Sequence, residues 1–337
     1  MILVTLGPKS DDEDTWQQMA AAGADAFRVP FAKETPAAQF DKCQRIKRCK
    51  WTHRQPTVLA DLPGGKPRTA NVSTISLAAG DKIRLVAGTS ASENAPYQIG
   101  VSFMPSDWSL NDTLIFGDEE LLARIVAEGN CQYECVIEKG GALRQKRGIV
   151  NRSRPHSYAT ITEFEHRIFQ DTRSGLVDGY IFSFVDSVGD IMLAREELSL
   201  HGWQDRLLIA KVETAQGLAN ISEILAASDG VLIGLGDLLV EVGFQNFFKT
   251  LDGGLLQVKK RLETRKPIII GTELLEISSV RKTPYRAEIG FVGYVLARGC
   301  TGLLLSGETT VGDQPYGAVA WARQLLLGEV LRDTEKL

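Results

Sequence analysis

The sequence lacks several features that mark whole classes of protein. No apolar run is long enough to span a bilayer, which takes about 20 residues, and no signal peptide opens the chain. Basic residues are not in excess, since the net charge is −4 and the pI is near 5.7. We therefore expect neither a membrane protein, nor a secreted protein, nor a nucleic-acid-binding protein.

Residues that form disulfides or zinc sites are also scarce, with 5 Cys and 4 His in 337 residues. Cys131 and Cys135 are close in sequence, but no second Cys/His pair lies at zinc spacing. We expect reduced thiols in a cytoplasmic protein. The His residues fall beside none of the carboxylates described below, so we expect them to be surface or packing residues.

Short apolar runs alternate instead with helical patterns at the start of the chain. The composition, 44% hydrophobic and 24% charged, is that of a globular protein with a large core. The pattern predicts strands and helices in the order strand 2–6, helix 11–22, strand 25–29, helix 36–49 and strand 57–60. A β-α-β-α-β opening predicts a parallel sheet.

The alternation is interrupted once and then resumes. Residues 67–150 contain short β-rich segments separated by turns, which predicts an inserted all-β lid domain. The later pattern predicts helices at 162–172, 188–201 and 316–331, and strands at 179–184, 206–210, 230–233, 267–270 and 302–305. Eight strands in all predict a (β/α)8 TIM barrel, with residues 1–66 and 151–337 forming the barrel and the lid inserted after strand three.

Charged and polar residues gather where the predicted strands end, and active sites of (β/α)8 barrels lie at these C-terminal ends. The residues concerned are Arg28, Asp61, Lys66, Arg68, Lys211, Glu213, Asp237 and Thr272. The loop 306–315, which opens a helix, is a weaker candidate for binding an anion through its backbone N–H groups.

The residue types suggest metal-assisted chemistry. Glu213 and Asp237 follow adjacent strands, and two carboxylates with water and substrate oxygens form an open Mg²⁺ or Mn²⁺ site. Lys211 and the arginines would neutralise a phosphate or an enolate oxygen, and Thr272 would donate or relay a proton. The other interpretation is that Lys211 and Glu213 form only a salt bridge at the barrel rim.

Seven stretches of the chain carry a family resemblance when taken together. They are "VTLGPKS", "AGADAFRVPF", "VLADLPGGKPRT", "GDEELLARIV", "GGALRQKRGIVN", "IAKVETAQGLANISEILAASDGVLIGLGDLLVEVG" and "TPYRAEIGFVGYVLARGCTGLLLSGETTVGDQP". Through them the chain resembles the pyruvate kinase family over nearly the whole length of the chain. Their order, including a β lid after the third strand, is also that of the family.

The resemblance implies phosphoryl transfer from phosphoenolpyruvate to ADP, giving pyruvate and ATP through an enolate. It implies that Glu213 and Asp237 hold the divalent metal and that Lys211 stabilises the transferring phosphoryl group. It further implies that Thr272 takes part in protonating the enolate. The implied contacts to substrate or phosphate are Arg28, Lys66, Arg68, Gly236, Asp237 and Thr272.

The sequence departs from the family pattern at the position of a monovalent cation. Pro30, Ala32 and Leu62 stand where potassium-dependent members carry ligands, and only Asp61 of that set remains. Lys66 stands where potassium-independent members also carry Lys, whose ammonium takes the place of the ion. We therefore expect no K⁺ requirement.

Further departures concern the nucleotide and the length of the chain. Lys33 and Arg147 are the candidate nucleotide-binding residues, although "AKET" replaces the usual Ser-His-Gly stretch. Leu235 stands where Arg is usual, and Glu273 replaces a Gln. The chain ends before the family's C-terminal domain, so we expect an unregulated enzyme and a homodimer formed through the barrel.

Two other interpretations remain open. The same metal and enolate groups would serve a lyase or aldolase acting on a 2-oxo acid, or a kinase for another acceptor. A non-catalytic ligand-binding homologue is the third. Nucleotide binding and turnover distinguish the three, because only the first needs ADP and the third binds ligand without turnover.

Overall fold

The computed structural model describes residues 1–70, 73–92, 97–117, 120–129, 132–153, 158–173, 175–259, 265–276 and 283–334. Cys131, one of the two neighbouring cysteines, lies outside them. The chain divides into two compact units. The first consists of Met1–Gly64, Thr160–Gly236 and Phe247–Leu337, and the second of Gly65–Ala159 and Asp237–Asn246. Whether residues 67–150 fold as a domain of their own stays a prediction.

The first unit contains a closed barrel of parallel strands in the order β1-β16-β15-β14-β13-β12-β3-β2. The strands are β1 (Ile2–Thr5), β2 (Ala26–Pro30), β3 (Thr57–Leu62), β12 (Gly179–Phe182), β13 (Leu207–Val212), β14 (Gly230–Gly234), β15 (Ile268–Gly271) and β16 (Gly302–Leu305). The predicted (β/α)8 fold is confirmed.

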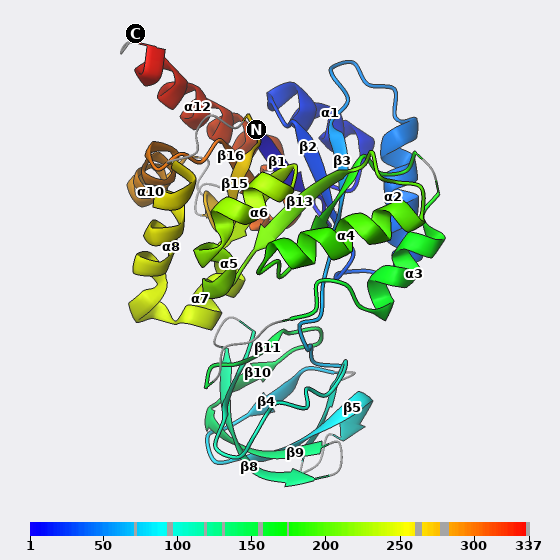
Figure 1. Cartoon of the computed structure of the whole chain (residues 1–337), viewed down its shortest axis with the longest axis vertical. Helices are drawn as coiled ribbons and strands as arrows, with labels where there is room; N and C mark the ends of the chain where they lie inside the picture. The colour runs from blue at the N-terminus through cyan, green and yellow to red at the C-terminus, as the bar shows by residue number, and fades with distance from the viewer. Residues whose placement is uncertain are drawn as a thin grey trace. The chain divides into compact units, whose positions relative to one another are not determined.

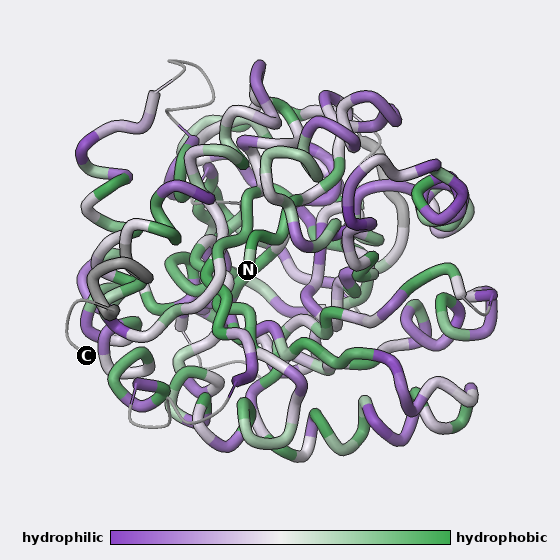
Figure 2. Tube along the Cα trace, turned by 90° about the horizontal axis from the view of Figure 1, so that it is seen from above, coloured by the Kyte–Doolittle hydropathy of each residue, from purple (hydrophilic) through white to green (hydrophobic). Residues whose placement is uncertain are grey.

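The barrel interior is filled by one apolar residue from each strand. These buried residues are Leu3, Ala26, Leu59, Ile181, Ile209, Leu232, Ile269 and Leu304. Strands covered on both faces need near-continuous apolar sequence, which explains why the runs do not alternate. Figure 2 shows hydrophobic segments gathered around the N-terminal strand and hydrophilic segments mostly at the periphery.

Helices surround these strands (Figure 1). Those of the first unit are α1 (Glu13–Ala22), α2 (Pro36–Arg48), α3 (Glu163–Asp171), α4 (Val188–Leu200), α5 (Ala215–Ala219), α6 (Ile221–Ala227), α8 (Phe244–Lys259), α10 (Arg286–Ala297), α11 (Gly307–Thr310) and α12 (Pro315–Thr334), whereas α7 (Leu235–Val242) falls mainly in the second unit. Their starts follow capping rules, since Asp12 accepts the Thr15 N–H before α1 and Thr35 accepts the Ala38 N–H before α2. No helix among the described residues is long and apolar enough to cross a membrane.

Two strands extend further than the sequence predicts. The strand predicted to stop at residue 60 runs to Leu62, and the one predicted to stop at 210 runs to Val212. Asp61 and Lys211 therefore lie within strands rather than after them, and Arg28 lies in the middle of β2. The apolar pattern ends before the strand does, because parallel pairing continues through residues near the open end of the barrel.

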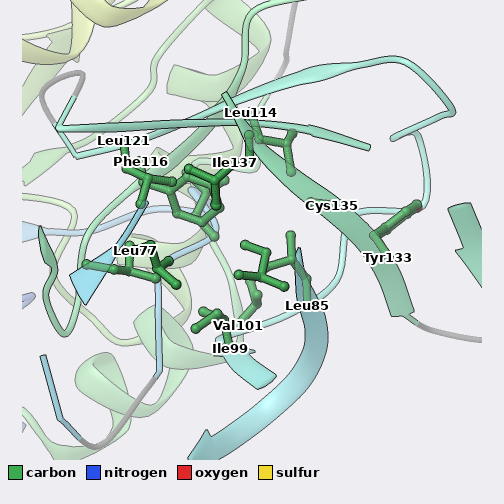
Figure 3. Close-up of a cluster of buried hydrophobic side chains, with 14 of the residues drawn as sticks. Leu77, Leu85, Ile99, Val101, Leu114, Phe116, Leu121, Tyr133, Cys135 and Ile137 are labelled. Carbon is green, nitrogen blue, oxygen red and sulfur yellow. The ribbon is translucent and has the colours of Figure 1, made fainter. Parts of the chain in front are cut away.

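The Gly65–Ala159 part of the second unit is built from β strands, as predicted for the insert. A six-stranded sheet has the order β11-β7-β8-β9-β5-β6, and β10 pairs with β4. The strands are β4 (Ile75–Leu77), β5 (Lys82–Ser92), β6 (Tyr97–Val101), β7 (Thr113–Phe116), β8 (Leu121–Gly129), β9 (Gln132–Lys139), β10 (Gly141–Leu143) and β11 (Ile149–Asn151). Its own apolar core, which includes Leu85, Phe116 and Ile137, is drawn in Figure 3.

Candidate active site

A buried ion pair lies at the C-terminal end of β13. Lys211 is the next-to-last residue of the strand, and its ammonium lies 2.8 Å from Glu213 Oε1. Only 12% of the Lys211 side chain and 1% of the Glu213 side chain are exposed. The Lys211 ammonium also donates to Ser183 Oγ at 3.4 Å. Desolvation makes such a pair a weak net stabiliser of the fold, so Lys211 and Glu213 are candidates for a functional role as well as for a rim salt bridge.

The neighbouring strand β14 leaves room for this pair by ending in glycine. A Cβ atom on Gly234 would come within 2.7 Å of Glu213 Oε1. Any other residue at position 234 would therefore displace the carboxylate. The close approach explains why a strand with five buried residues ends in the one residue that has no side chain.

Strained backbone follows β15. Thr272 has a φ of 87° and Glu273 a φ of 56°, in the left-handed region that β-branched and bulky residues rarely adopt. A Cβ atom on Gly236 would lie 3.5 Å from Thr272 Cγ2, so the residue before Asp237 approaches Thr272 closely. Strain of this kind persists only where the surroundings hold it, and it concentrates at functional sites.

A second ion pair joins strands β2 and β3 at the same end of the barrel. Arg28 Nη2 donates to Asp61 Oδ2 at 2.8 Å, and Arg28 Nη1 donates to Thr5 Oγ1 at 3.0 Å. Among the described residues, neither Arg28 Nε nor Asp61 Oδ1 has a hydrogen-bond partner, although both atoms are buried. Buried polar atoms without partners are costly, so each of these two atoms needs a partner beyond the described residues, either water or a bound ligand.

The turn after β2 places Lys33 in solvent. The Lys33 N–H donates to Pro30 O at 3.2 Å, and the side chain is exposed. The next residue, Glu34, accepts from Lys42 Nζ at 3.4 Å, and Lys42 itself is buried in α2. The turn is thus held by the buried Lys42 ammonium together with apolar packing of the buried Phe31 against Phe40.

The second unit holds the remaining predicted residues. The Lys66 ammonium forms a close ion pair with Asp237 Oδ1, and 4% of the Lys66 side chain is exposed. Arg68 lies opposite Gly148 in an isolated bridge, and the Arg147 guanidinium lies 3.0 Å from Glu120 Oε1. The Lys66 ammonium therefore neutralises part of the charge of Asp237, which is a predicted metal ligand.

The structure groups the predicted residues in pairs. In the first unit these are Arg28 with Asp61, Lys211 with Glu213 and Gly236 with Thr272, and in the second unit Lys66 with Asp237. Among the described residues, no group of three His, Cys, Asp or Glu side chains is arranged to hold a metal ion.

Comparison with known proteins decides the family. The family model described as "Pyruvate kinase, barrel domain" matches residues 1–319 of the chain. The chain belongs to the pyruvate kinase family. It is 26% identical to the pyruvate kinase of Thermotoga maritima over 99% of this chain and 71% of that protein. It is 29% identical to that of Haemophilus influenzae over 97% of this chain and 69% of that protein, and 30% identical to that of Geobacillus stearothermophilus over 97% and 56%.

One acidic residue near a strand end, Asp186, was not among the residues predicted from the sequence. Asp186 follows β12 and is buried, and its Oδ1 accepts a hydrogen bond from the Thr214 hydroxyl. Burial raises the pKa of Asp186 to about 6, and the nearby Asp190 carboxylate adds to the rise. A lone Asp after a strand gave no signal, because its partner lies 28 residues away.

The loop after β16 also differs from the simple anion loop suggested by its sequence. Its first N–H, of Ser306, donates to Glu308 Oε2 at 2.7 Å, so the chain's own carboxylate satisfies it. Glu308 is fully buried. The loop is therefore organised around the buried carboxylate of Glu308.

Proposed function

We propose that the chain transfers a phosphoryl group from phosphoenolpyruvate to ADP, giving pyruvate and ATP through the enolate of pyruvate. The observation that carries the proposal is the buried Lys211–Glu213 pair at the C-terminal end of β13. Membership in the pyruvate kinase family and the strained Thr272 support it further. An ammonium held in a largely desolvated place stabilises negative charge better than one in water.

A divalent cation, Mg²⁺ or Mn²⁺, fits the donor chemistry of Glu213. Its carboxylate offers hard oxygen atoms in a buried place, and Mg²⁺ commonly binds one or two carboxylates while keeping several waters. The bound ion would supply positive charge beside the enolate oxygen. Asp237, the second proposed ligand, belongs to the other unit, and its part in holding the ion remains a prediction.

The cationic side chains take roles by charge and position. Lys211 stabilises the transferring phosphoryl group and the enolate, and Arg28 binds phosphate. In the second unit, Arg68 and Lys66 are also proposed to bind substrate or phosphate. After transfer, the enolate carbon accepts a proton in a step that involves Thr272, which leaves pyruvate as the product.

The proposal also covers a nucleotide site and the position of a monovalent cation. Lys33 is exposed, as a residue that contacts a diphosphate must be in the absence of ligand, and Arg147 is proposed with it. No K⁺ is required in this proposal. What supports this is that Lys66, whose ammonium would take the place of the ion, is buried.

The first experiment measures pyruvate formation from phosphoenolpyruvate and Mg²⁺, with and without ADP, each with and without K⁺ at constant ionic strength. We expect pyruvate formation that depends on ADP and is unchanged by K⁺. A large increase on adding K⁺ would contradict the cation proposal alone. Absence of ADP-dependent pyruvate would contradict the transfer reaction.

The metal assignment is tested by Glu213→Gln and Asp237→Asn. Each substitution removes a formal charge with little change of shape, so the fold is expected to remain while metal-dependent turnover is lost. Mn²⁺ binding is measured directly by titration, which does not depend on activity. Near-normal Mn²⁺ affinity in both variants would rule out these residues as ligands.

A second candidate function is enolate chemistry with another acceptor or another 2-oxo acid. The turn after β2 favours it, because Glu34 and the buried Lys42 organise a segment that differs from the family's nucleotide stretch. Mn²⁺ binding that Glu213→Gln abolishes, without ADP-dependent pyruvate, would support this candidate.

A homodimer through the barrel is proposed as the assembly. Large apolar and aromatic side chains are exposed on α8 and around α10, namely Phe248, Tyr285 and Ile289. Light scattering of the purified protein tests the assembly, and Phe248→Asp is expected to favour the monomer. An unchanged dimer in that variant would place the interface elsewhere.

A further inference from the structure

The loop after β15 needs an external restraint. Thr272 and Glu273 are consecutive residues with positive φ, and neither is glycine. Each costs free energy that the loop's own sequence does not offset. Leu274 and Leu275, which follow directly, are buried, so the loop returns at once into the packed interior.

Glu308 supplies contacts at this point. Its Oε1 accepts the N–H groups of Leu274 at 3.0 Å and Leu275 at 2.8 Å, and its Oε2 accepts the Ser306 N–H at 2.7 Å. The side chain is fully buried. Hydrogen bonds to a buried carboxylate are short and strong, so three of them fix the loops after β15 and β16 to one another.

The contacts that begin at Glu308 continue around the barrel rim. Ser306 Oγ lies 3.5 Å from Thr5 Oγ1, which accepts from Arg28. Thr309 Oγ1 donates to Thr5 O at 2.8 Å. The chain of contacts thus runs from the loop that carries Thr272 to the proposed phosphate-binding Arg28.

We infer that Glu308 is a positioning residue, whose buried carboxylate holds the 272–275 loop and thereby keeps Thr272 in its left-handed conformation for proton transfer to the enolate. The catalytic part of this inference rests on the proposed function. Glu308 itself touches no reacting atom. It acts through the backbone N–H groups of Leu274 and Leu275.

The test variant is Glu308→Gln, and Glu165→Gln is its matched control. Glu165 is equally buried, and it accepts the backbone N–H groups of Gly64 and Thr162 at the start of another helix. A glutamine at 308 keeps one acceptor oxygen but turns an NH₂ group toward the Ser306 N–H. Both variants are expected to lose stability by a similar amount, so stability alone does not decide the question.

The deciding readout is exchange of pyruvate methyl protons with solvent, measured beside phosphoryl transfer. Glu308→Gln is expected to slow exchange by about 10²-fold, as a displaced catalytic group does, and to leave the KM for phosphoenolpyruvate unchanged. Glu165→Gln should retain the wild-type exchange rate. Equal exchange rates in the two variants would overturn the inference.

Two combinations of substitutions separate positioning from a general structural effect. In a Thr272→Ala background, Glu308→Gln should cause little further loss, because both changes act on one step. Glu273→Gly should restore part of the exchange lost in Glu308→Gln, since glycine adopts a φ of 56° without strain. Fully additive losses, or no restoration, would contradict the inference.

A readout that needs no turnover keeps the two proposals apart. Amide hydrogen exchange at Leu274 and Leu275 should be faster in Glu308→Gln and unchanged in Glu165→Gln. If the wild-type protein neither transfers phosphoryl groups nor exchanges pyruvate protons, the proposed function fails, and this measurement decides whether Glu308 holds the loop. If Leu274 and Leu275 exchanged their amide protons as slowly in Glu308→Gln as in the wild type, the inference that Glu308 holds the loop would be overturned as well.

Discussion

The two ends of the barrel use charge in different ways. At the N-terminal end, three aspartates each accept a backbone N–H from the start of the neighbouring strand at 2.7 Å and lie beside a cation. The three sets are Asp25 with Ile2 and Arg323, Asp178 with Val58 and Lys47, and Asp229 with Leu208 and Arg195.

At the C-terminal end, charges are paired mainly with other side chains. Lys211 pairs with Glu213, and Arg28 pairs with Asp61, whose Oδ1 is buried without a hydrogen-bond partner among the described residues. The aspartates of the N-terminal end join neighbouring strands through backbone N–H groups, whereas the charges of the other end contact one another through their side chains. The difference follows the general division of (β/α)8 barrels into a stability face and an active face.

The largest expected effect comes from removing a cation of the C-terminal end. Lys211→Met should lower phosphoryl transfer by about 10²–10³-fold or more, the loss seen when one preorganised stabilising group is removed. The free energy of unfolding should also fall, by about 3–5 kcal/mol, because the change takes the Lys211 ammonium away from the buried Glu213 carboxylate. The control is Lys47→Met, which removes a cation from the N-terminal end of the barrel and is expected to leave the activity unchanged. Normal transfer in Lys211→Met would leave a rim salt bridge as the better account.

A smaller effect, on stability instead of rate, is expected at the N-terminal end. Asp178→Ala leaves the Val58 N–H without its acceptor and Lys47 without its partner. The free energy of unfolding should fall by about 1–3 kcal/mol, which is the cost of an unsatisfied buried group. Urea denaturation measures it, with KM values as the check that the site is intact. If Asp178→Ala lost activity without losing stability, the two ends of the barrel would not differ in the way described.

The smallest effect concerns the pH dependence of stability. Because the pKa of Asp186 is raised to about 6, the folded state holds its proton more tightly than the unfolded chain does. Its contribution to stability is therefore greatest below the usual value of 3.8 and is lost as the pH rises toward 6. Asp186→Asn should remove this decline. Unfolding measured between these pH values tests it, and a parallel decline in the variant would show that another group is responsible.

The barrel was predictable because its signal is local. Buried parallel strands give continuous apolar runs, and the charged residues that interrupt those runs, such as Lys211 and Glu213, mark the open end. The ends of β3 and β13 were placed too early for the same reason, since the apolar run stops before the hydrogen bonding does.

The supporting contacts were not predictable from the sequence. Glu308 meets Leu274 across 34 residues, and Asp186 meets Thr214 across 28. No pattern in either segment indicates its partner, because a contact between a carboxylate and a distant backbone N–H or hydroxyl group gives no periodic pattern in the sequence. The strain at Thr272 was hidden too, because a threonine, unlike a glycine, does not signal positive φ.

The closure of the barrel sets an order of events during synthesis. β1 pairs with β16, and the Met1 ammonium donates to Thr301 O across 300 residues. Within the barrel, β1 is therefore synthesised long before its neighbour β16, and the edge of β1 that pairs with β16 stays unpaired until then. Exposed strand edges invite pairing with other chains, so the interval before β16 emerges is when a nascent chain is most prone to aggregate and has most use for a chaperone.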